Sequence, residues 1–274
     1  MWHRYVGAVT AVEAPFASPE RLIGLGAVHN FRDLGGYSTA DGRQVQWRRL
    51  FRADALDRLT PPDVELLRPM GLRTVIDLRS AGEISERGTF PVESYPVAFH
   101  HLAVIDTTRN PEDSETRKIF MEAAEDPTRV VEFLTNAYQH MLERGGDKLA
   151  AGLRLLAEPD ALPAVFHCAA GKDRTGLMAG ILLSGLGVAD EDVIADYALS
   201  AGAFARTRAW ADTNKPELVQ WLDSVPTPLQ GAHPDAMRGV LQRFREEHGG
   251  ARGFVAQYGV TDDVWDRLAT ALLA

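Results

Sequence analysis

The stretch AVFHCAAGKDRTGLMAG, residues 164–180, constrains the fold of this chain more than any other segment. It starts inside a short apolar run, PAVFHCA, that has the composition of a buried strand, and it leads into RTGLMAGILLSGLG. The second run is apolar on nearly all sides, which is typical of a helix buried against a sheet. The sequence therefore predicts a strand, a tight turn and a buried helix in direct succession.

Other segments alternate between strand and helix patterns. RTVIDLRS is a compact β-branched run typical of a buried parallel strand, and a further strand is expected near residues 96–105. TPPDVELLRPMGL predicts a short helix with Thr60 as N-cap, Pro61 at the first helical position and Gly71 at its end. This alternation indicates an α/β fold with a mostly parallel central sheet flanked by helices.

The rest of the chain has a helical pattern. Residues 107–146 are charged, with apolar residues at helical spacing, and LAAGLRLLAEP predicts another helix. With 274 residues and 45% hydrophobic content, the chain fits one large domain. From Asp190 onward we expect helices interrupted at Pro216, at residues 226–234 and at Gly249-Gly250.

Composition excludes several classes of protein. A net charge of −9 disfavours nucleic acid as a partner, because affinity for phosphate backbones comes mostly from Lys and Arg. A single cysteine rules out an intramolecular disulfide framework and a thiolate-rich metal site, and it agrees with a reducing compartment. The longest apolar run, residues 176–188, is too short to span a bilayer, and the N-terminus lacks a secretory signal pattern. We therefore expect a cytoplasmic protein without an integral membrane segment.

The turn after the predicted strand has the features of a phosphate-binding loop. A turn that leads into a helix N-terminus directs its backbone N–H groups and the positive end of the helix dipole toward one point, which attracts an anion of phosphate size. The planar guanidinium of Arg174 can hold two oxygens of that anion. The predicted phosphate-binding residues are Ala169, Ala170, Gly171, Lys172, Asp173 and Arg174.

The same field favours a thiolate at Cys168, which would then act as a nucleophile aimed at phosphorus. Thr175 is expected to donate a hydrogen bond to the sulfur, and His167 to brace the loop. The simpler interpretation of Cys168 is a buried small hydrophobe, but that role requires no Gly, Lys and Arg at these spacings. The loop also differs from the GK[ST] of nucleotide-binding P-loops, because Asp173 stands where the magnesium-binding hydroxyl would be.

HCAAGKDRTG, together with NFRDLGGY at residues 30–37, VIDLRS at 75–80 and DYALS at 196–200, resembles the bacterial atypical tyrosine phosphatase family. The resemblance implies a cysteine-phosphatase fold with a helical lid, which we place at about residues 107–146. It also implies hydrolysis of phosphomonoesters through a phosphocysteine on Cys168, with Arg174 as phosphate clamp and with no metal or other cofactor. Residues 1–20 have no counterpart in this comparison and are interpreted as an N-terminal extension.

Two aspartates compete for the role of general acid, which must protonate the leaving group. Asp106 occupies the place where a loop aspartate follows the same strand in the family, although it is equally well interpreted as a helix cap. Asp173 lies within the loop itself, so its proximity is assured, and we favour it slightly.

Some other polar pairs are expected to be structural. Arg32 and Asp33 in NFRD, and Asp77 and Arg79 in VIDLRS, are interpreted as buried ion-pair scaffolds behind the loop. His100-His101 has no third ligand at a usual spacing, so we expect strand residues there and no metal site.

The substrate class is left open between three phosphorylated partners. A phosphotyrosine protein is the leading candidate, with a phosphoinositide or a small phosphorylated metabolite or nucleotide as alternatives, since Lys172 adds a second positive charge to the loop. A sulfurtransferase and a phosphate-binding module without turnover are the remaining alternatives. Both Cys168 and Arg174 are present, which disfavours the module, and the Arg-Thr-Gly ending favours phosphate chemistry over sulfur transfer.

Overall fold

The structure is a computed structural model that describes residues 21–105, 129–225 and 227–274. The N-terminal extension of residues 1–20 therefore lies outside the described residues. The same holds for residues 107–128 of the predicted lid, so the assignment of 107–146 as a lid stays a prediction.

A five-stranded sheet forms the centre of the molecule, in the order β1-β2-β5-β3-β4. Only the β1–β2 pair is antiparallel, and all other neighbours run parallel. The predicted mostly parallel α/β sheet is therefore confirmed. The strands are β1 (Arg32–Asp33), β2 (Leu50–Ala53), β3 (Thr74–Asp77), β4 (Ala98–His101) and β5 (Ala164–His167).

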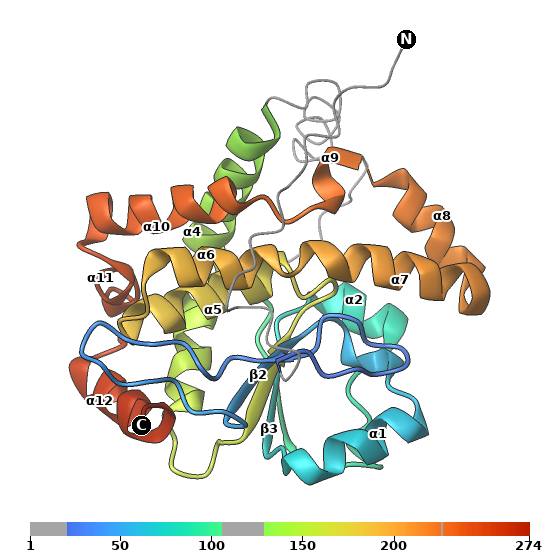
Figure 1. The fold of residues 1–274 in the computed structure, drawn as a ribbon, viewed down its shortest axis with the longest axis horizontal. Helices are drawn as coiled ribbons and strands as arrows, with labels where there is room; N and C mark the ends of the chain where they lie inside the picture. The colour runs from blue at the N-terminus through green and yellow to red at the C-terminus, as the bar shows by residue number, and fades with distance from the viewer. Residues whose placement is uncertain (1–20, 106–128, 226) are drawn as a thin grey trace.

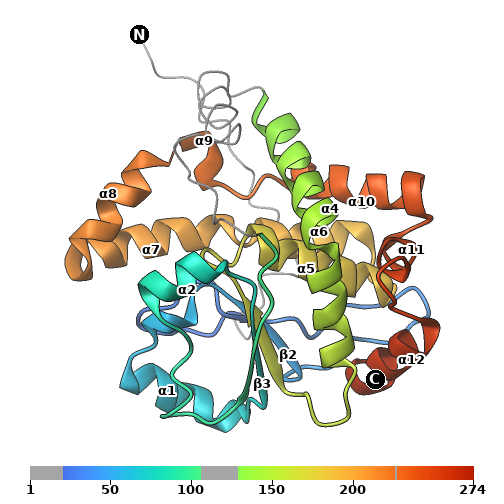
Figure 2. The same cartoon turned by 180° about the vertical axis from the view of Figure 1, so that it is seen from behind.

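The two faces of the sheet carry different helices, and the alternation of side chains along each strand explains the division. Phe51, Val75 and Val165 point to the face that packs against α1 (Pro61–Leu67). Their neighbours Leu50, Ile76 and Phe166 belong to the larger core on the other face. Figures 1 and 2 show α1 and α2 (Ala81–Arg87) on one side of the sheet and the remaining helices gathered on the other side and above it.

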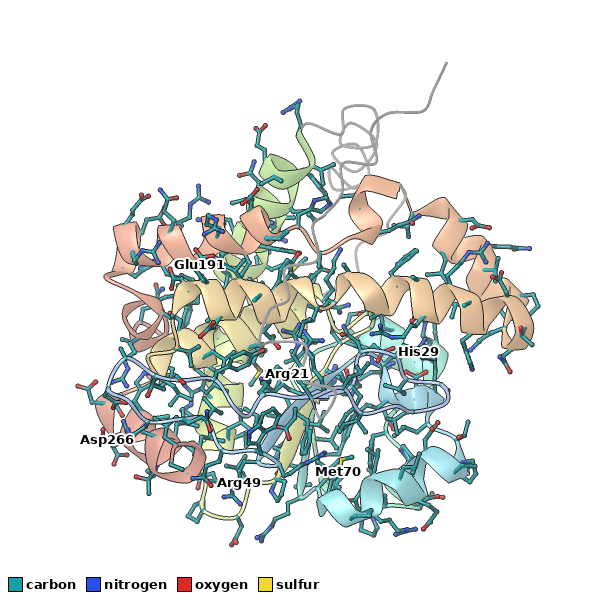
Figure 3. All side chains as sticks on the ribbon, viewed as in Figure 1. Arg21, His29, Arg49, Met70, Glu191 and Asp266 are labelled. Carbon is teal, nitrogen blue, oxygen red and sulfur yellow. The ribbon has the colours of Figure 1, made fainter. Side chains whose placement is uncertain are left out.

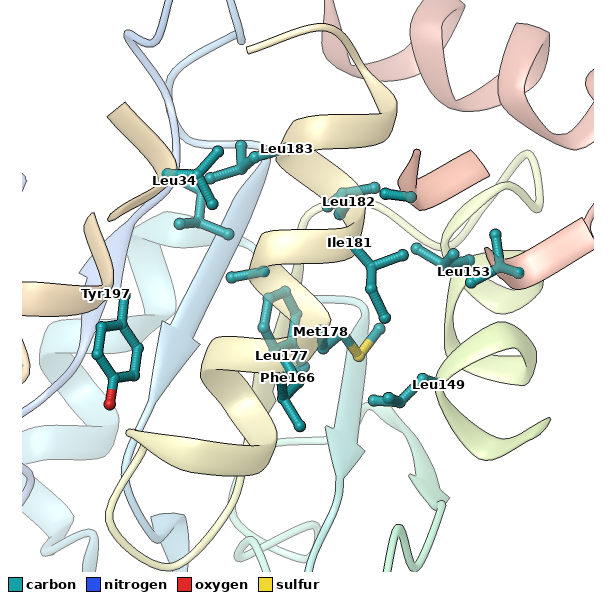
Figure 4. Close-up of a cluster of buried hydrophobic side chains, with 14 of the residues drawn as sticks. Leu34, Leu149, Leu153, Phe166, Leu177, Met178, Ile181, Leu182, Leu183 and Tyr197 are labelled. Atoms are coloured by element: carbon teal, nitrogen blue, oxygen red, sulfur yellow. The ribbon is translucent and has the colours of Figure 1, made fainter. Parts of the chain in front are cut away.

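Helix α5 (Asp173–Gly185) is the centre of the larger core, and it is buried almost all round, as its composition predicts. Figure 4 shows its side chains lying between Phe166 of β5 and the α4 residues Leu149 and Leu153. The helices on this side are α4 (Val130–Leu156), α6 (Asp190–Ala198), α10 (Pro234–His248), α11 (Ala251–Ala256) and α12 (Asp262–Leu272). Helices α7 (Ala201–Asn214) and α8 (Pro216–Ser224) extend from α6 past the carboxyl ends of the strands (Figure 1).

The prediction of separate helices ending at residue 146 and starting in LAAGLRLLAEP is wrong, because α4 runs unbroken from Val130 to Leu156. The two glycines inside it serve close packing. A Cβ on Gly145 would lie 2.3 Å from the carbonyl oxygen of Val104, and a Cβ on Gly146 would lie 2.5 Å from the ring of Tyr258. Neighbouring segments approach so closely that no side chain fits, and the helix tolerates the glycines for that reason.

The predicted ends of helices agree best with the structure where a side chain caps the helix. Thr60 caps α1, accepting a hydrogen bond from the Asp63 N–H, and Pro61 occupies the first turn as predicted. Gly71 ends the following 3₁₀ turn (Arg68–Met70) in the left-handed conformation, with φ of 59°. The expected loop at residues 226–234 is wrong in part, because it contains a short helix, α9 (Thr227–Gln230).

Candidate active site

The predicted strand, turn and helix surround Cys168. Strand β5 ends at His167 and α5 begins at Asp173, so Cys168 to Lys172 form the turn at the carboxyl end of a central parallel strand, where open α/β sheets bind ligands. Gly171 has φ of +66°, and a Cβ there would lie 2.5 Å from the Ala53 carbonyl oxygen. Only glycine therefore fits the loop at this position.

The N-terminus of α5 carries no side-chain cap. The first N–H groups of a helix have no partner within the helix, and the side chain of the N-cap residue, Lys172, makes no hydrogen bond to them. Cys168, which is 1% exposed, lies just before them. The arrangement suits an anion held at the helix N-terminus beside the thiol.

Arg174 lies in the first turn of α5 and contacts Glu83 of α2. Its two terminal nitrogens donate to the two carboxylate oxygens at 2.5 and 2.9 Å. Burial alone would raise the pKa of Glu83, but Arg174 and the Ser80 N–H outweigh burial and lower it to about 2. Glu83 was not expected from the sequence, although Ser80-Ala-Gly-Glu83 has the spacing of a capping box, a usable signal for the helix start.

Asp173 is held by a tyrosine from α4. The Tyr138 hydroxyl donates to Asp173 Oδ1 at 2.6 Å and lies 2.6 Å from the Tyr197 hydroxyl of α6. Burial, together with the charge of Asp173, raises the pKa of Tyr138 well above its usual value. The tyrosine is therefore a stable donor to the carboxylate, and no local pattern in the sequence pointed to it.

Lys172 points away from the centre of the loop. Its ammonium donates to the carbonyl oxygens of Leu229 and Gly231 at 2.9 and 3.2 Å, and it lies 3.5 Å from Asp173 Oδ1. The ammonium of Lys172 is therefore held against the segment that follows α8.

His167 and Thr175, the two residues expected to support the loop, are both fully buried. His167 Nδ1 lies 3.3 Å from the Cys168 carbonyl oxygen, and Nε2 lies 3.5 Å from Asp77 Oδ2. Burial lowers the pKa of His167 despite the opposing charge of Asp77. The Thr175 hydroxyl has no hydrogen-bond partner within the described ranges, so the predicted bond to the sulfur is not formed here.

The loop before β1 borders the site on another side. Asn30 Nδ2 donates to the Ala170 carbonyl oxygen at 2.9 Å, which ties this loop to the turn around Cys168. Figure 3 shows His29 close to α7, and Arg206 of α7 donates to the His29 carbonyl oxygen at 2.8 Å. Helix α7 is thus anchored beside the candidate site.

The predicted scaffold behind the loop is confirmed for one pair and corrected for the other. Arg79 and Asp77 are both fully buried and form an ion pair, at 2.7 Å. Arg32 does not pair with Asp33, however. It binds Asp196 of α6 at 3.1 Å, because adjacent residues in a strand point to opposite faces of the sheet.

Asp106 lies outside the described residues, so its role as general acid stays a prediction. His100 and His101 lie in β4 as expected, and His101 Nε2 is 2.8 Å from the Arg79 carbonyl oxygen. Across the three described ranges, no group of three or more His, Cys, Asp or Glu side chains is arranged to hold a metal ion. None of the helices described there combines the length and apolar character needed to cross a membrane.

Comparisons with known proteins agree on one family. A sequence model of the "Tyrosine phosphatase family" matches residues 23–274. The triple specificity protein phosphatase PtpB of Mycobacterium tuberculosis is 28% identical over 276 residues, covering 89% of this chain and 96% of that protein. A relative from Cupriavidus necator is 35% identical over 173 residues, which cover 62% of this chain and 59% of the length of that relative.

Two solved structures were also found by their shape. P. aeruginosa TpbA in complex with pTyr has a TM-score of 0.32 and 12% identity, covering 76% of this chain and 99% of that one. The Siw14 catalytic core has a TM-score of 0.34 and 11% identity, covering 77% and 100%.

Proposed function

The chain belongs to the tyrosine phosphatase family, and from this we propose that it is a cysteine-dependent phosphomonoester phosphatase acting on phosphotyrosine in proteins. One observation carries the proposal. Cys168 and the N-terminus of α5 lie at the carboxyl end of β5, and Arg174 lies in the first turn of α5, where its guanidinium binds Glu83. These are the parts that bind a phosphate and attack it.

In the proposed first step the Cys168 thiolate attacks phosphorus. An S–P bond forms, the bond from phosphorus to the leaving oxygen breaks, and a carboxylic acid protonates that oxygen. Water then attacks the phosphocysteine, the S–P bond breaks, and the water proton passes to the same carboxylate. Cys168 leaves as the thiolate, so the cycle is balanced without a cofactor.

Arg174 is proposed to hold the phosphate while Glu83 holds Arg174. A guanidinium has five N–H donors, and Glu83 accepts two of them. The others are available to phosphate oxygens. Glu83 therefore fixes the plane of the guanidinium before substrate arrives, which lowers the entropy lost on binding.

We assign the general acid to Asp173. Tyr138 donates to its Oδ1, which leaves Oδ2 as the oxygen to carry the transferable proton. To separate this assignment from Asp106, Asp173→Asn and Asp106→Asn should be compared on aryl phosphates whose leaving groups differ in basicity. Loss of the general acid makes the rate fall steeply as the leaving group becomes more basic. A steep dependence in Asp106→Asn with none in Asp173→Asn would reverse the assignment.

Phosphotyrosine is favoured over more highly charged substrates because Lys172 is engaged elsewhere. Its ammonium keeps its charge but donates to two backbone carbonyls, so fewer of its N–H groups are available to a second phosphate. Phosphoinositides and small phosphomonoesters remain the alternative substrates for the same chemistry. Lys172→Ala is expected to change turnover of phosphotyrosine peptide and inositol phosphates by the same factor. Selective loss of inositide turnover would favour the lipid alternative.

The test of the proposal is phosphate release by wild type and Cys168→Ser in the presence of a chelator. The substrates are an aryl phosphate, a phosphotyrosine peptide, a phosphoserine peptide, inositol phosphates and nucleotides. We expect turnover to be highest on phosphotyrosine peptide and to be absent in Cys168→Ser. Failure of the folded wild-type protein on every substrate would refute it, and transfer of sulfur from thiosulfate to cyanide would then identify a sulfurtransferase.

A further inference from the structure

Three charged side chains lie fully buried beneath the turn that holds Cys168. Arg32 of β1, Arg52 of β2 and Asp196 of α6 are 2%, 0% and 1% exposed. Asp196 accepts from Arg32 Nε at 3.1 Å and from Arg52 Nη1 at 2.5 Å. One carboxylate thus faces two guanidinium groups. The cluster of Arg32, Arg52 and Asp196 carries one positive charge in excess.

Arg52 connects this cluster directly to the turn. Its Nη2 donates to the Gly171 carbonyl oxygen at 2.8 Å, while Nη1 binds Asp196. The planar guanidinium therefore fixes Gly171 relative to α6. Gly171 also lies directly against β2, since a Cβ there would be 2.5 Å from the Ala53 carbonyl oxygen.

Other charges near the turn are compensated or negative. Arg174 is paired with Glu83, and Lys172 lies 3.5 Å from Asp173. On the opposite side, Arg79 is paired with both Asp77 and Asp57, an arrangement with one negative charge in excess. Among the described residues, the charged and titratable groups that face the turn around Cys168 or its contacts include Arg21, Arg32, Tyr37, Arg52, Asp54, Asp57, Asp77, Arg79, Glu83, Tyr138, His167, Lys172, Asp173, Arg174, Asp196 and Tyr197. Within this set, the excess buried positive charge in direct contact with the turn is in the cluster that contains Arg52.

We propose that Arg52 is a positioning residue for Cys168: it fixes the Gly171 carbonyl and places an uncompensated buried positive charge behind the turn, favouring the thiolate and the bound phosphate. The proposal rests on the proposed function of Cys168 as nucleophile. In a buried site a charge is poorly screened by salt, so its effect on a nearby thiol persists at physiological ionic strength. Burial and the neighbouring Arg32 lower the pKa of Arg52 to about 10, so it stays protonated at neutral pH.

The test uses the fact that Cys168 is the only cysteine in the chain. The ultraviolet absorbance of a thiolate, followed against pH and corrected with the matching Cys168→Ser protein, reports ionisation of this one group and needs no catalysis. Arg52→Met removes the positive charge, so the midpoint should move to higher pH by about one unit, the lower end of the usual range for a neighbouring charge. Asp196→Asn removes the negative charge, so the midpoint should move to lower pH.

The opposite signs separate an electrostatic role from a structural one. General loosening of the turn would move both midpoints in the same direction, and that result, or no movement in either variant, would overturn the proposal. Arg52→Lys keeps the charge but loses the planar fork, and we expect a smaller upward shift than in Arg52→Met. It provides a second measurement if Arg52→Met does not fold.

A matched control is Arg252→Met. Arg252 also donates to a backbone carbonyl of the α5 region, that of Gly185, but at the far end of the helix from Cys168. The midpoint of the thiol titration in Arg252→Met should equal that of wild type. If wild type shows no phosphatase activity while the midpoints shift as expected, the proposed function fails and only the effect of Arg52 on the ionisation of Cys168 stands. Normal phosphatase activity with unshifted midpoints would support the proposed function and overturn the role of Arg52.

Discussion

Helices α1 and α2 begin with the same local motif and use it differently. In α1, the N–H of Thr60 donates to Asp63 and the N–H of Asp63 donates back to the Thr60 hydroxyl. In α2, Ser80 and Glu83 exchange the same two bonds. The remaining contacts of the two carboxylates differ. Asp63 accepts from the Gly26 N–H at 2.6 Å, whereas Glu83 accepts from Arg174.

The difference shows how a capping residue gains a second role. Both carboxylates have lowered pKa values, because their hydrogen-bond donors outweigh burial. The donors around Asp63 are the hydroxyl of Thr60 and backbone N–H groups, which hold α1 to the chain before β1. Glu83 instead faces a guanidinium in the turn around Cys168, so a helix cap becomes part of the candidate site.

The largest expected effect comes from removing the charge of Glu83. In Glu83→Gln the guanidinium of Arg174 loses its bidentate partner, and we expect kcat/KM for phosphotyrosine peptide to fall about 100-fold, the scale of a small misplacement. The matched variant Asp63→Asn should stay within about twofold of wild type in activity, because Asp63 binds Thr60 and Gly26 and not Arg174. A twofold change corresponds to about 0.4 kcal/mol in the activation free energy. Equal losses in the two variants would show that the helix caps, not the contact to Arg174, are responsible.

The pH dependence of stability should also distinguish Glu83. Its pKa of about 2 lies below the usual value of 4.5, so its contribution to stability is complete above 4.5 and is lost as pH falls toward 2. The free energy of unfolding of wild type should exceed that of Glu83→Gln by roughly 2–3 kcal/mol at neutral pH. We expect urea denaturation to show this gap closing between pH 4.5 and 2. A gap that is constant over this range would contradict the assigned ion pair.

Tyr138 extends the comparison to a third element, α4. Tyr138→Phe removes the donor to Asp173 but keeps the ring, so we expect kcat to fall about tenfold, equivalent to 1.36 kcal/mol, with KM nearly unchanged. Tyr197→Phe is the control, because its hydroxyl contacts the Tyr138 hydroxyl, whereas the bond to Asp173 comes from Tyr138. Steady-state kinetics of both variants on one peptide would decide, and a larger loss in Tyr197→Phe would contradict the role given to Tyr138.

The smallest effects are expected from the two caps themselves. Thr60→Ala and Ser80→Ala should each lower the free energy of unfolding by about 1 kcal/mol, the usual cost of losing an N-cap side chain. Chemical denaturation measures this loss. Activity should fall severalfold only in Ser80→Ala, because Ser80 orients Glu83. Loss of activity in Thr60→Ala as well would mean that α1 also influences the site.

The sequence predicted features that depend on neighbouring residues. The order of β5, turn and α5 around Cys168, the start of α1 at Pro61 and the mostly parallel sheet were all predicted and observed. Each of these features follows from the periodicity of apolar side chains, from a helix cap or from a turn, all of which involve residues close together in the chain. The glycines at 145–146 are the counterexample, because the reason for them lies in Val104 and Tyr258, distant in the sequence.

The tertiary structure decided which charged residues that are distant in the sequence form ion pairs. Arg32 binds Asp196, 164 residues away, in place of its neighbour Asp33, and Arg174 binds Glu83, 91 residues away. The sequence by itself determined that a thiol, a turn and a helix N-terminus come together at Cys168, because the backbone conformation of a short segment is set locally. Which buried charges surround that thiol was decided only by the fold, since electrostatic interaction depends on distance in space, and the order of strands in the sheet sets that distance.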